Sequence, residues 1–174
     1  GIVHPYSNAA YAATIALQMR MIARSGLDTV AVVTGGRSEK AVLRDFPELE
    51  DMQVIRIADF IAHSLRAASR AGIRRIIVGC MPGKLMKYAC GDENTHAHKT
   101  KLRPELLRTM GIGLPDSLPL EQFDTMGELA SHLTPEDYRS LLGTLKEKAL
   151  DHLRRWADGS EVVLMLYNER GERI

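Results

Sequence analysis

Cysteine is scarce in this sequence, and its scarcity excludes a disulfide framework. The 174 residues contain two cysteines, Cys80 and Cys90, and these do not form a Cys-x-x-Cys pair. Small secreted domains that depend on disulfides need more. We therefore expect a reduced, cytoplasmic setting. Because Cys80 directly follows an apolar run, we expect its thiol to be packed and inert.

Long apolar stretches and an excess of one charge are also missing. No run approaches the length of a membrane span, and no signal peptide is recognisable, so we expect no membrane partner. The 23 Lys and Arg nearly balance the 22 Asp and Glu, for a net charge of +1. A nucleic-acid partner is therefore not expected. Basic residues gather only locally, as from Lys99 to Arg103, which suits a small polyanionic ligand.

The chain does contain an alternation of short apolar runs and amphipathic helical patterns. The apolar, β-branched runs predict buried strands at 30–33, 53–57, 76–78 and 161–167. Helical spacing and capping residues predict helices at about 7–25, 38–46, 59–71, 83–90, 104–110, 121–133 and 134–158. We predict a single Rossmann-like domain over residues 1–174, with three α/β/α layers and a mainly parallel sheet.

Two segments of the chain echo one another. Residues 25–32 align without a gap on residues 71–78, and each copy reads as helix end, glycine cap, short link and buried strand. A glycine turn and a new helix follow each copy. Right-handed crossovers bring the carboxyl ends of parallel strands to one edge. The turns at Gly35-Gly36 and Gly79–Gly83 should therefore lie together at the edge where open α/β sheets bind ligands.

The second turn differs from a phosphate-binding P-loop. Three residues, not four, separate Gly79 from Gly83, and Leu85 rather than Ser or Thr follows Lys84. The missing hydroxyl leaves no side chain for Mg²⁺, which disfavours an ATPase. Two interpretations stay open for this turn. It either faces a ligand or is a tight connection with a solvated lysine.

A polar cluster follows the helix predicted at 83–90, and it includes His96 and His98. The residue types suit a metal ion, but their spacing matches no known zinc pattern. A polar loop at the mouth of a binding cleft is the alternative. We expect no protein-bound metal.

Four motifs together resemble one known family. They are Gly-Ile-Val-His-Pro-Tyr-Ser at 1–7, Val-Thr-Gly-Gly-Arg-Ser-Glu-Lys at 33–40, Asp-Phe at 59–60, and Gly-x-x-x-Gly-Lys-Leu-x-Lys at 79–87 with Thr95-His96. In this order and spacing they are similar to the C-terminal part of CbiD, the cobalt-precorrin-5B C(1)-methyltransferase family of anaerobic cobalamin biosynthesis. The chain's ending, from Ala149 to Gly171, resembles the family's last helix and strand.

The resemblance implies a reaction and its partners. Methyl would pass from S-adenosylmethionine to C-1 of cobalt-precorrin-5B and give cobalt-precorrin-6A. The cobalt would belong to the corrinoid substrate. The family's N-terminal domain would be absent, so this chain would be a C-terminal fragment whose activity alone is an open question. A homo-oligomer also stays open.

The resemblance also implies site residues. Those implied to bind the methyl donor are Gly35, Gly36, Glu39, Lys40, Gly79, Gly83 and Lys84. Arg37, Lys87 and Thr95 would bind the substrate, and His96 would orient it or act as a base. This chain has Ala97 where the family usually has Ser. Two other functions compete with the enzyme, namely a non-catalytic module that binds a nucleotide or tetrapyrrole and a purely structural or dimerising domain.

Overall fold

The computed structural model describes residues 7–95, 103–111, 114 and 117–174. Its four strands are β1 (Thr29–Val33), β2 (Val54–Arg56), β3 (Arg75–Cys80) and β4 (Glu161–Leu166). They form one parallel sheet in the order β2-β1-β3-β4. The α-helices are α1 (Asn8–Arg24), α2 (Gly36–Asp45), α3 (Ile61–Ala71), α4 (Pro82–Ala89), α5 (Pro104–Thr109), α6 (Met126–Ser131) and α7 (Pro135–Ala157), with short 3-10 turns at Asp51–Gln53 and Leu120–Gln122.

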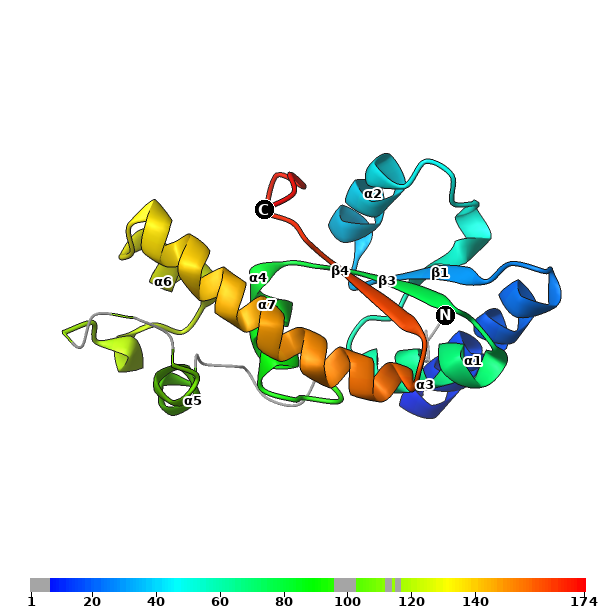
Figure 1. Ribbon diagram of the computed structural model, residues 1–174, viewed down its shortest axis with the longest axis horizontal. Helices are drawn as coiled ribbons and strands as arrows, with labels where there is room; N and C mark the ends of the chain where they lie inside the picture. The colour runs from blue at the N-terminus through cyan, green and yellow to red at the C-terminus, as the bar shows by residue number, and fades with distance from the viewer. Residues whose placement is uncertain (1–6, 96–102, 112–113, 115–116) are drawn as a thin grey trace, which may run out of the picture.

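Helices cover both faces of the sheet, which confirms the predicted three-layer α/β/α class (Figure 1). Helix α2 packs on one face, and α1, α3, α4 and α7 pack on the other. Alternate strand residues point to opposite faces. In β1, Val30 and Val32 therefore join the larger core, whereas Ala31 and Val33 join the smaller core beneath α2.

The two echoing segments form neighbouring strands. In the sheet Thr29 lies opposite Arg75, and Val32 lies opposite Val78. This register is the same as the gap-free alignment of residues 25–32 on 71–78. Because each copy ends at the same level of the sheet, the two glycine turns follow adjacent strands at one edge.

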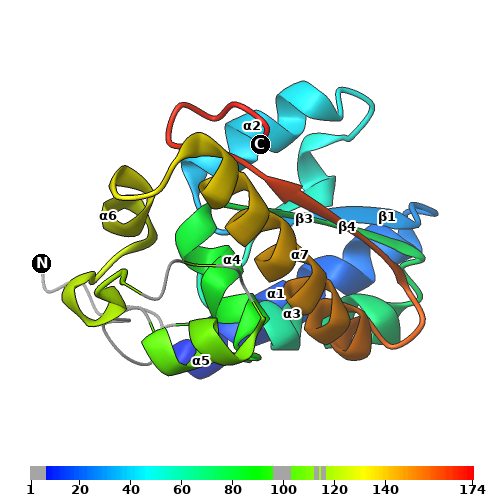
Figure 2. The ribbon, with the colours of Figure 1, turned by 60° about the vertical axis from the view of Figure 1, so that its left-hand side comes forward.

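The chain leaves β1 and β3 toward opposite faces. From β1 it enters α2 on one face, and from β3 it enters α4 on the other (Figures 1 and 2). In doubly wound sheets this divergence is the topological switch point, and it opens a crevice outside the carboxyl ends of the two strands. In this sheet the switch point lies between β1 and β3, the strands that are followed by the Gly35-Gly36 and Gly83 turns.

The end of the chain folds back along β4. Tyr167 forms an isolated antiparallel bridge with Arg173, and the Ile174 amide donates to the Leu166 carbonyl at 3.0 Å. The turn between them is held by the Asn168 side-chain oxygen, which accepts two backbone amide hydrogens at 2.9 Å. In the described part of the chain, no helix is long and apolar enough to span a membrane.

Some local predictions differ from the structure. Helix α2 begins at Gly36, so Ser38 lies inside its first turn instead of capping it. The predicted helix at 121–133 is replaced by a 3-10 turn and α6, because Thr125 and Glu128 form a capping box that starts a new helix at Met126. Asp59, predicted as the cap of α3, instead pairs with a lysine that follows β3.

Candidate functional site

The first glycine turn is a rigid entry into α2 with an open backbone. The Ser38 hydroxyl accepts from the amides of Thr34 and Gly35 at 3.2 Å and donates to the Gly35 carbonyl at 2.9 Å. A methyl group added at Gly35 would meet no described atom within 4 Å, and at Gly36 it would meet the Arg56 guanidinium at 3.7 Å. A ligand can therefore approach this backbone closely, beside the positive end of a helix dipole.

The second turn opens α4 and is equally accessible. Met81 is the N-cap residue, and Pro82 occupies the first helical position, where the missing amide hydrogen costs nothing. Within the described residues, a Cβ on Gly83 would touch nothing inside 4 Å. The two open turns thus lie side by side, at the ends of β1 and β3.

Gly79 contributes differently from Gly83, since it lies inside β3 and under α2. A Cβ at this position would be 2.5 Å from Val42 Cγ2 and 3.3 Å from Val33 Cγ1. Such distances are shorter than carbon atoms tolerate, so the missing side chain lets α2 pack directly on the sheet. Gly79 therefore permits the close approach of α2 to the sheet, whereas Gly83 leaves space for a ligand.

The Lys84 side chain belongs to a hydrogen-bond network with Asp59 and Thr95. Its ammonium group forms an ion pair with Asp59 and donates to Thr95 Oγ1 at 2.7 Å. The Thr95 hydroxyl in turn donates to Asp59 Oδ1 at 2.7 Å, and Thr95 is 3% exposed. The network links the loop after β2 with the first turn of α4, both at the carboxyl edge of the sheet.

Lys87 belongs to the same network, one helical turn further along α4. Its ammonium group donates to the Thr95 carbonyl at 2.8 Å. Partial burial, together with the neighbouring positive charge of Lys84, lowers the pKa of Lys87. Lys84 and Lys87 thereby hold Thr95 from two sides.

Two ion pairs hold the chain just before Thr95. The Arg66 guanidinium of α3 donates to both carboxylate oxygens of Glu93 at 2.6 and 2.8 Å. Arg103 Nη2 donates to both carboxylate oxygens of Asp92 at 2.8 and 3.0 Å. The Glu93 carbonyl also accepts from the Ala62 amide in the first turn of α3 at 3.1 Å. The path of residues 92–95 across the carboxyl edge is therefore set by charge-assisted bonds.

The charged residues predicted on α2 lie elsewhere. Glu39 accepts from Arg56 of β2 at 2.5 and 3.0 Å. Arg37 and Lys40 line a cavity of about 300 Å³ between α2 and the C-terminal turn, together with Arg44. Because α2 and α4 cover opposite faces of the sheet, this basic cavity is separate from the network around Lys84 and Lys87. The predicted base, His96, lies outside the described residues.

Sequence reasoning missed two partners, Asp59 and Arg56. Arg56 is the last residue of β2, and Asp59 lies in the loop that follows it. Arg56 binds Glu39 in the first turn of α2, which follows the neighbouring strand β1. Asp59 binds Lys84 in the first turn of α4, which follows β3. The signal was available, because parallel strands bring their carboxyl ends to one edge and charges of opposite sign at two such ends can meet. Among the described residues, no group of three His, Cys, Asp or Glu is placed to hold a metal ion.

The two thiols are expected to react at very different rates. Cys80 is fully buried, which raises its pKa to about 12, and burial also raises the pKa of the half-buried Cys90. Less thiolate means slower alkylation. With iodoacetamide at pH 8, mass spectrometry should find Cys90 modified slowly and Cys80 protected until urea unfolds the protein. Native-state labelling of Cys80 as fast as Cys90 would contradict this packing.

Several proteins similar to this chain carry the name cobalt-precorrin-5B C(1)-methyltransferase. The protein of Variovorax paradoxus is 34% identical over 182 residues, which cover 100% of this chain and 49% of the relative. That of Methylococcus capsulatus is 37% identical over 117 residues, or 66% of this chain and 31% of the relative. That of Leptospira interrogans is 35% identical over 123 residues, or 70% of this chain and 34% of the relative.

The chain is homologous to the C-terminal portion of this family. The resemblance to CbiD that the four motifs indicated is thereby confirmed. The chain spans about half the length of the Variovorax CbiD protein. No family model and no solved structure matches the chain.

Proposed function

We propose that this chain is the part of a CbiD enzyme where S-adenosylmethionine donates its methyl group to C-1 of cobalt-precorrin-5B. The product is cobalt-precorrin-6A. The observation that carries the proposal is the pair of open glycine turns, which follow adjacent strands and diverge to opposite faces. The names of the CbiD relatives supply the reaction. A cytoplasmic setting remains a prediction.

The chemistry asks mainly for positioning. The methyl carbon forms a bond to C-1 of the corrinoid as its bond to the sulfonium breaks, and the thioether leaves without charge. In-line displacement of this kind gains most from holding the two reactants aligned and free of water. Rigid strand ends and helix starts are suited to that task.

Individual residues have distinct proposed roles. Backbone amides at Gly36 and Gly83 bind polar groups of the donor, such as its carboxylate. Gly35, whose amide is used by Ser38, lets the donor approach the turn closely. Glu39, oriented by Arg56, accepts ribose hydroxyl hydrogens. Lys84 acts through Thr95 and Asp59, holding the segment that leads to His96.

Arg37 and Lys40 border a basic cavity, where they meet carboxylates of the substrate. On the other face of the sheet, Lys87 and Thr95 fix the chain just ahead of His96, the proposed base or orienting group. The cobalt ion enters as part of the substrate, and the protein residues named here act on the organic groups.

Donor binding is tested by calorimetry with S-adenosylhomocysteine on the intact protein. A side chain at Gly83 has open space around it, so Gly83→Leu is expected to fold and to weaken binding at least tenfold by filling the crevice. Gly83→Ala is the matched control, with a much smaller effect. Absence of any heat with the unmodified protein would overturn the proposal.

A further inference from the structure

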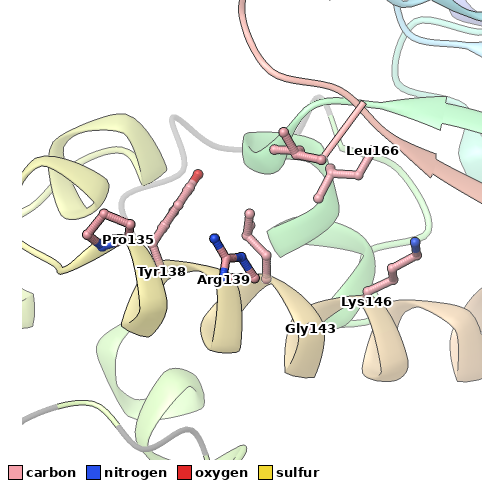
Figure 3. A pocket seen from close by; sticks show the side chains of 8 residues that line it. Pro135, Tyr138, Arg139, Gly143, Lys146 and Leu166 are labelled. Carbon is pink, nitrogen blue, oxygen red and sulfur yellow. The ribbon is translucent and has the colours of Figure 1, made fainter. Parts of the chain in front are cut away.

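A second cavity, of about 460 Å³, opens along the N-terminal half of α7 (Figure 3). Its floor is a face of that helix formed by Tyr138, Leu142 and Gly143. Leu166 at the end of β4 lies across from this face (Figure 3), and Ile174 of the folded-back chain end also lines the cavity. The cavity is lined mostly by apolar atoms and has the size of a small-molecule site.

The face of α7 that lines the cavity lies at the border of the larger core, since Leu142 is 7% exposed and belongs to that core whereas Gly143 is exposed. Leu141, Leu145 and Ala149 turn toward the larger core and are fully buried. The N-terminal half of α7 continues past the strands, toward α6 (Figures 1 and 2). Its other side, which includes the exposed Gly143, therefore has no sheet above it.

The cavity lies at the same edge of the sheet as the proposed donor site. Leu166 lies opposite Cys80, the last residue of β3, and β3 pairs with β1. Neighbouring strands are spaced by ~4.8 Å, so the end of β4 is roughly 10 Å from the end of β1. A molecule in this cavity would have one side turned toward a donor held by the two glycine turns.

Two cationic side chains belong to the lining of the cavity. Arg139 and Lys146 both line it, and the described residues of its lining include no Asp or Glu. Burial, and the charge of Glu169 near the rim, raise the pKa of Tyr138, so its hydroxyl keeps its proton and can donate. An apolar floor with cationic edges suits a molecule that has an apolar body and carboxylates at its periphery.

We propose that this cavity binds one edge of a carboxylate-bearing tetrapyrrole ring, the corrinoid substrate class. The inference rests on the proposed function and adds the location of the methyl acceptor. One face of the ring contacts Leu142 and Leu166, and two of its peripheral carboxylates reach Arg139 and Lys146. Only an edge of the macrocycle fits, and the remainder extends toward the glycine turns.

The test uses the intact protein and dicyanocobyrinic acid, a corrinoid with free carboxylates. Gly143 is exposed, and a Cβ there meets no described atom within 4 Å, so Gly143→Phe fills the cavity without disturbing the core. It also removes a helix-weakening glycine. We expect its corrinoid affinity to fall at least tenfold, while Gly143→Ala retains the affinity of the unmodified protein.

Charge is tested separately. Lys146→Gln is expected to weaken corrinoid binding several-fold, and Lys148→Gln, an exposed lysine on the same helix outside the cavity, is the matched control. Unchanged corrinoid affinity in Gly143→Phe would overturn the inference, as would an unmodified protein that binds S-adenosylhomocysteine but not the corrinoid. A change of oligomeric state in Gly143→Phe with normal corrinoid binding would assign the cavity to another copy of the chain instead.

The result of the S-adenosylhomocysteine titration does not determine the result of the corrinoid titration. Loss of S-adenosylhomocysteine binding counts against the proposed reaction, and the corrinoid titration still decides what the cavity binds. Conversely, tight donor binding by Gly143→Phe with lost corrinoid binding supports both assignments.

Discussion

Replacing Gly79 by alanine is expected to lower the free energy of unfolding by about 2 kcal/mol. The new methyl group would lie 2.5 Å from Val42 Cγ2 and 3.3 Å from Val33 Cγ1. Valine side chains have little freedom to turn away, so α2 must shift off the sheet. Urea unfolding followed by circular dichroism measures the loss.

A double-mutant cycle separates packing from other effects of the substitution. Val42→Ala removes the overlapping methyl groups, so Gly79→Ala should cost much less in that background. If the two costs simply add, the overlap is not the cause. Because α2 carries Gly36 at its start, the displaced helix should also weaken donor binding, even though Gly79 itself lies under the helix.

The second large effect is expected for Lys84→Met, which keeps the aliphatic stem and removes the ammonium group. Asp59 then loses the ion pair with Lys84, and Thr95 Oγ1 loses a donor at 2.7 Å. Removing one partner of an ion pair this poorly exposed is destabilising because the other charge was desolvated to form it, and we expect a loss of about 1–3 kcal/mol in urea unfolding. Lys148→Met, on the exposed side of α7, should change stability by less than about 0.5 kcal/mol.

The same variant assigns a role to Lys84. If the lysine acts through Thr95, Lys84→Met should leave the affinity for S-adenosylhomocysteine nearly unchanged while it reduces turnover. A loss of donor affinity as large as that of Gly83→Leu would instead show that Lys84 contacts the donor. An unchanged free energy of unfolding in Lys84→Met would show that the network of Lys84, Asp59 and Thr95 does not stabilise the fold.

The parallel pair at the centre of the fold could be predicted because its signal is local and repeated. Each copy carries a left-handed glycine, Gly26 or Gly72, a fixed distance before a β-branched run. Such glycines fix where a helix ends, and the following run fixes where a strand begins. The buried stripe of α7 was equally legible, since helical spacing alone places its leucines on one side.

Two features could not be predicted from the sequence, because they depend on contacts between distant segments. Asp59 before an apolar run is typical of a helix cap, yet an ion pair across 25 residues outweighs that local bond. The cavity above α7 requires the chain end to fold back beside Leu166. The spacing of residues within α7 carries no information about this fold-back of the chain end.

The borders of the sheet also bear on how copies of this protein meet. A long unpaired strand at a border invites another chain to add to the sheet, which leads to aggregation. Here β2 is three residues long and ends in the charged Arg56. At the opposite border, the bonds from Arg173 and Ile174 occupy the last positions beside Leu166 and Tyr167. Strand addition is thereby disfavoured where the sheet would otherwise grow.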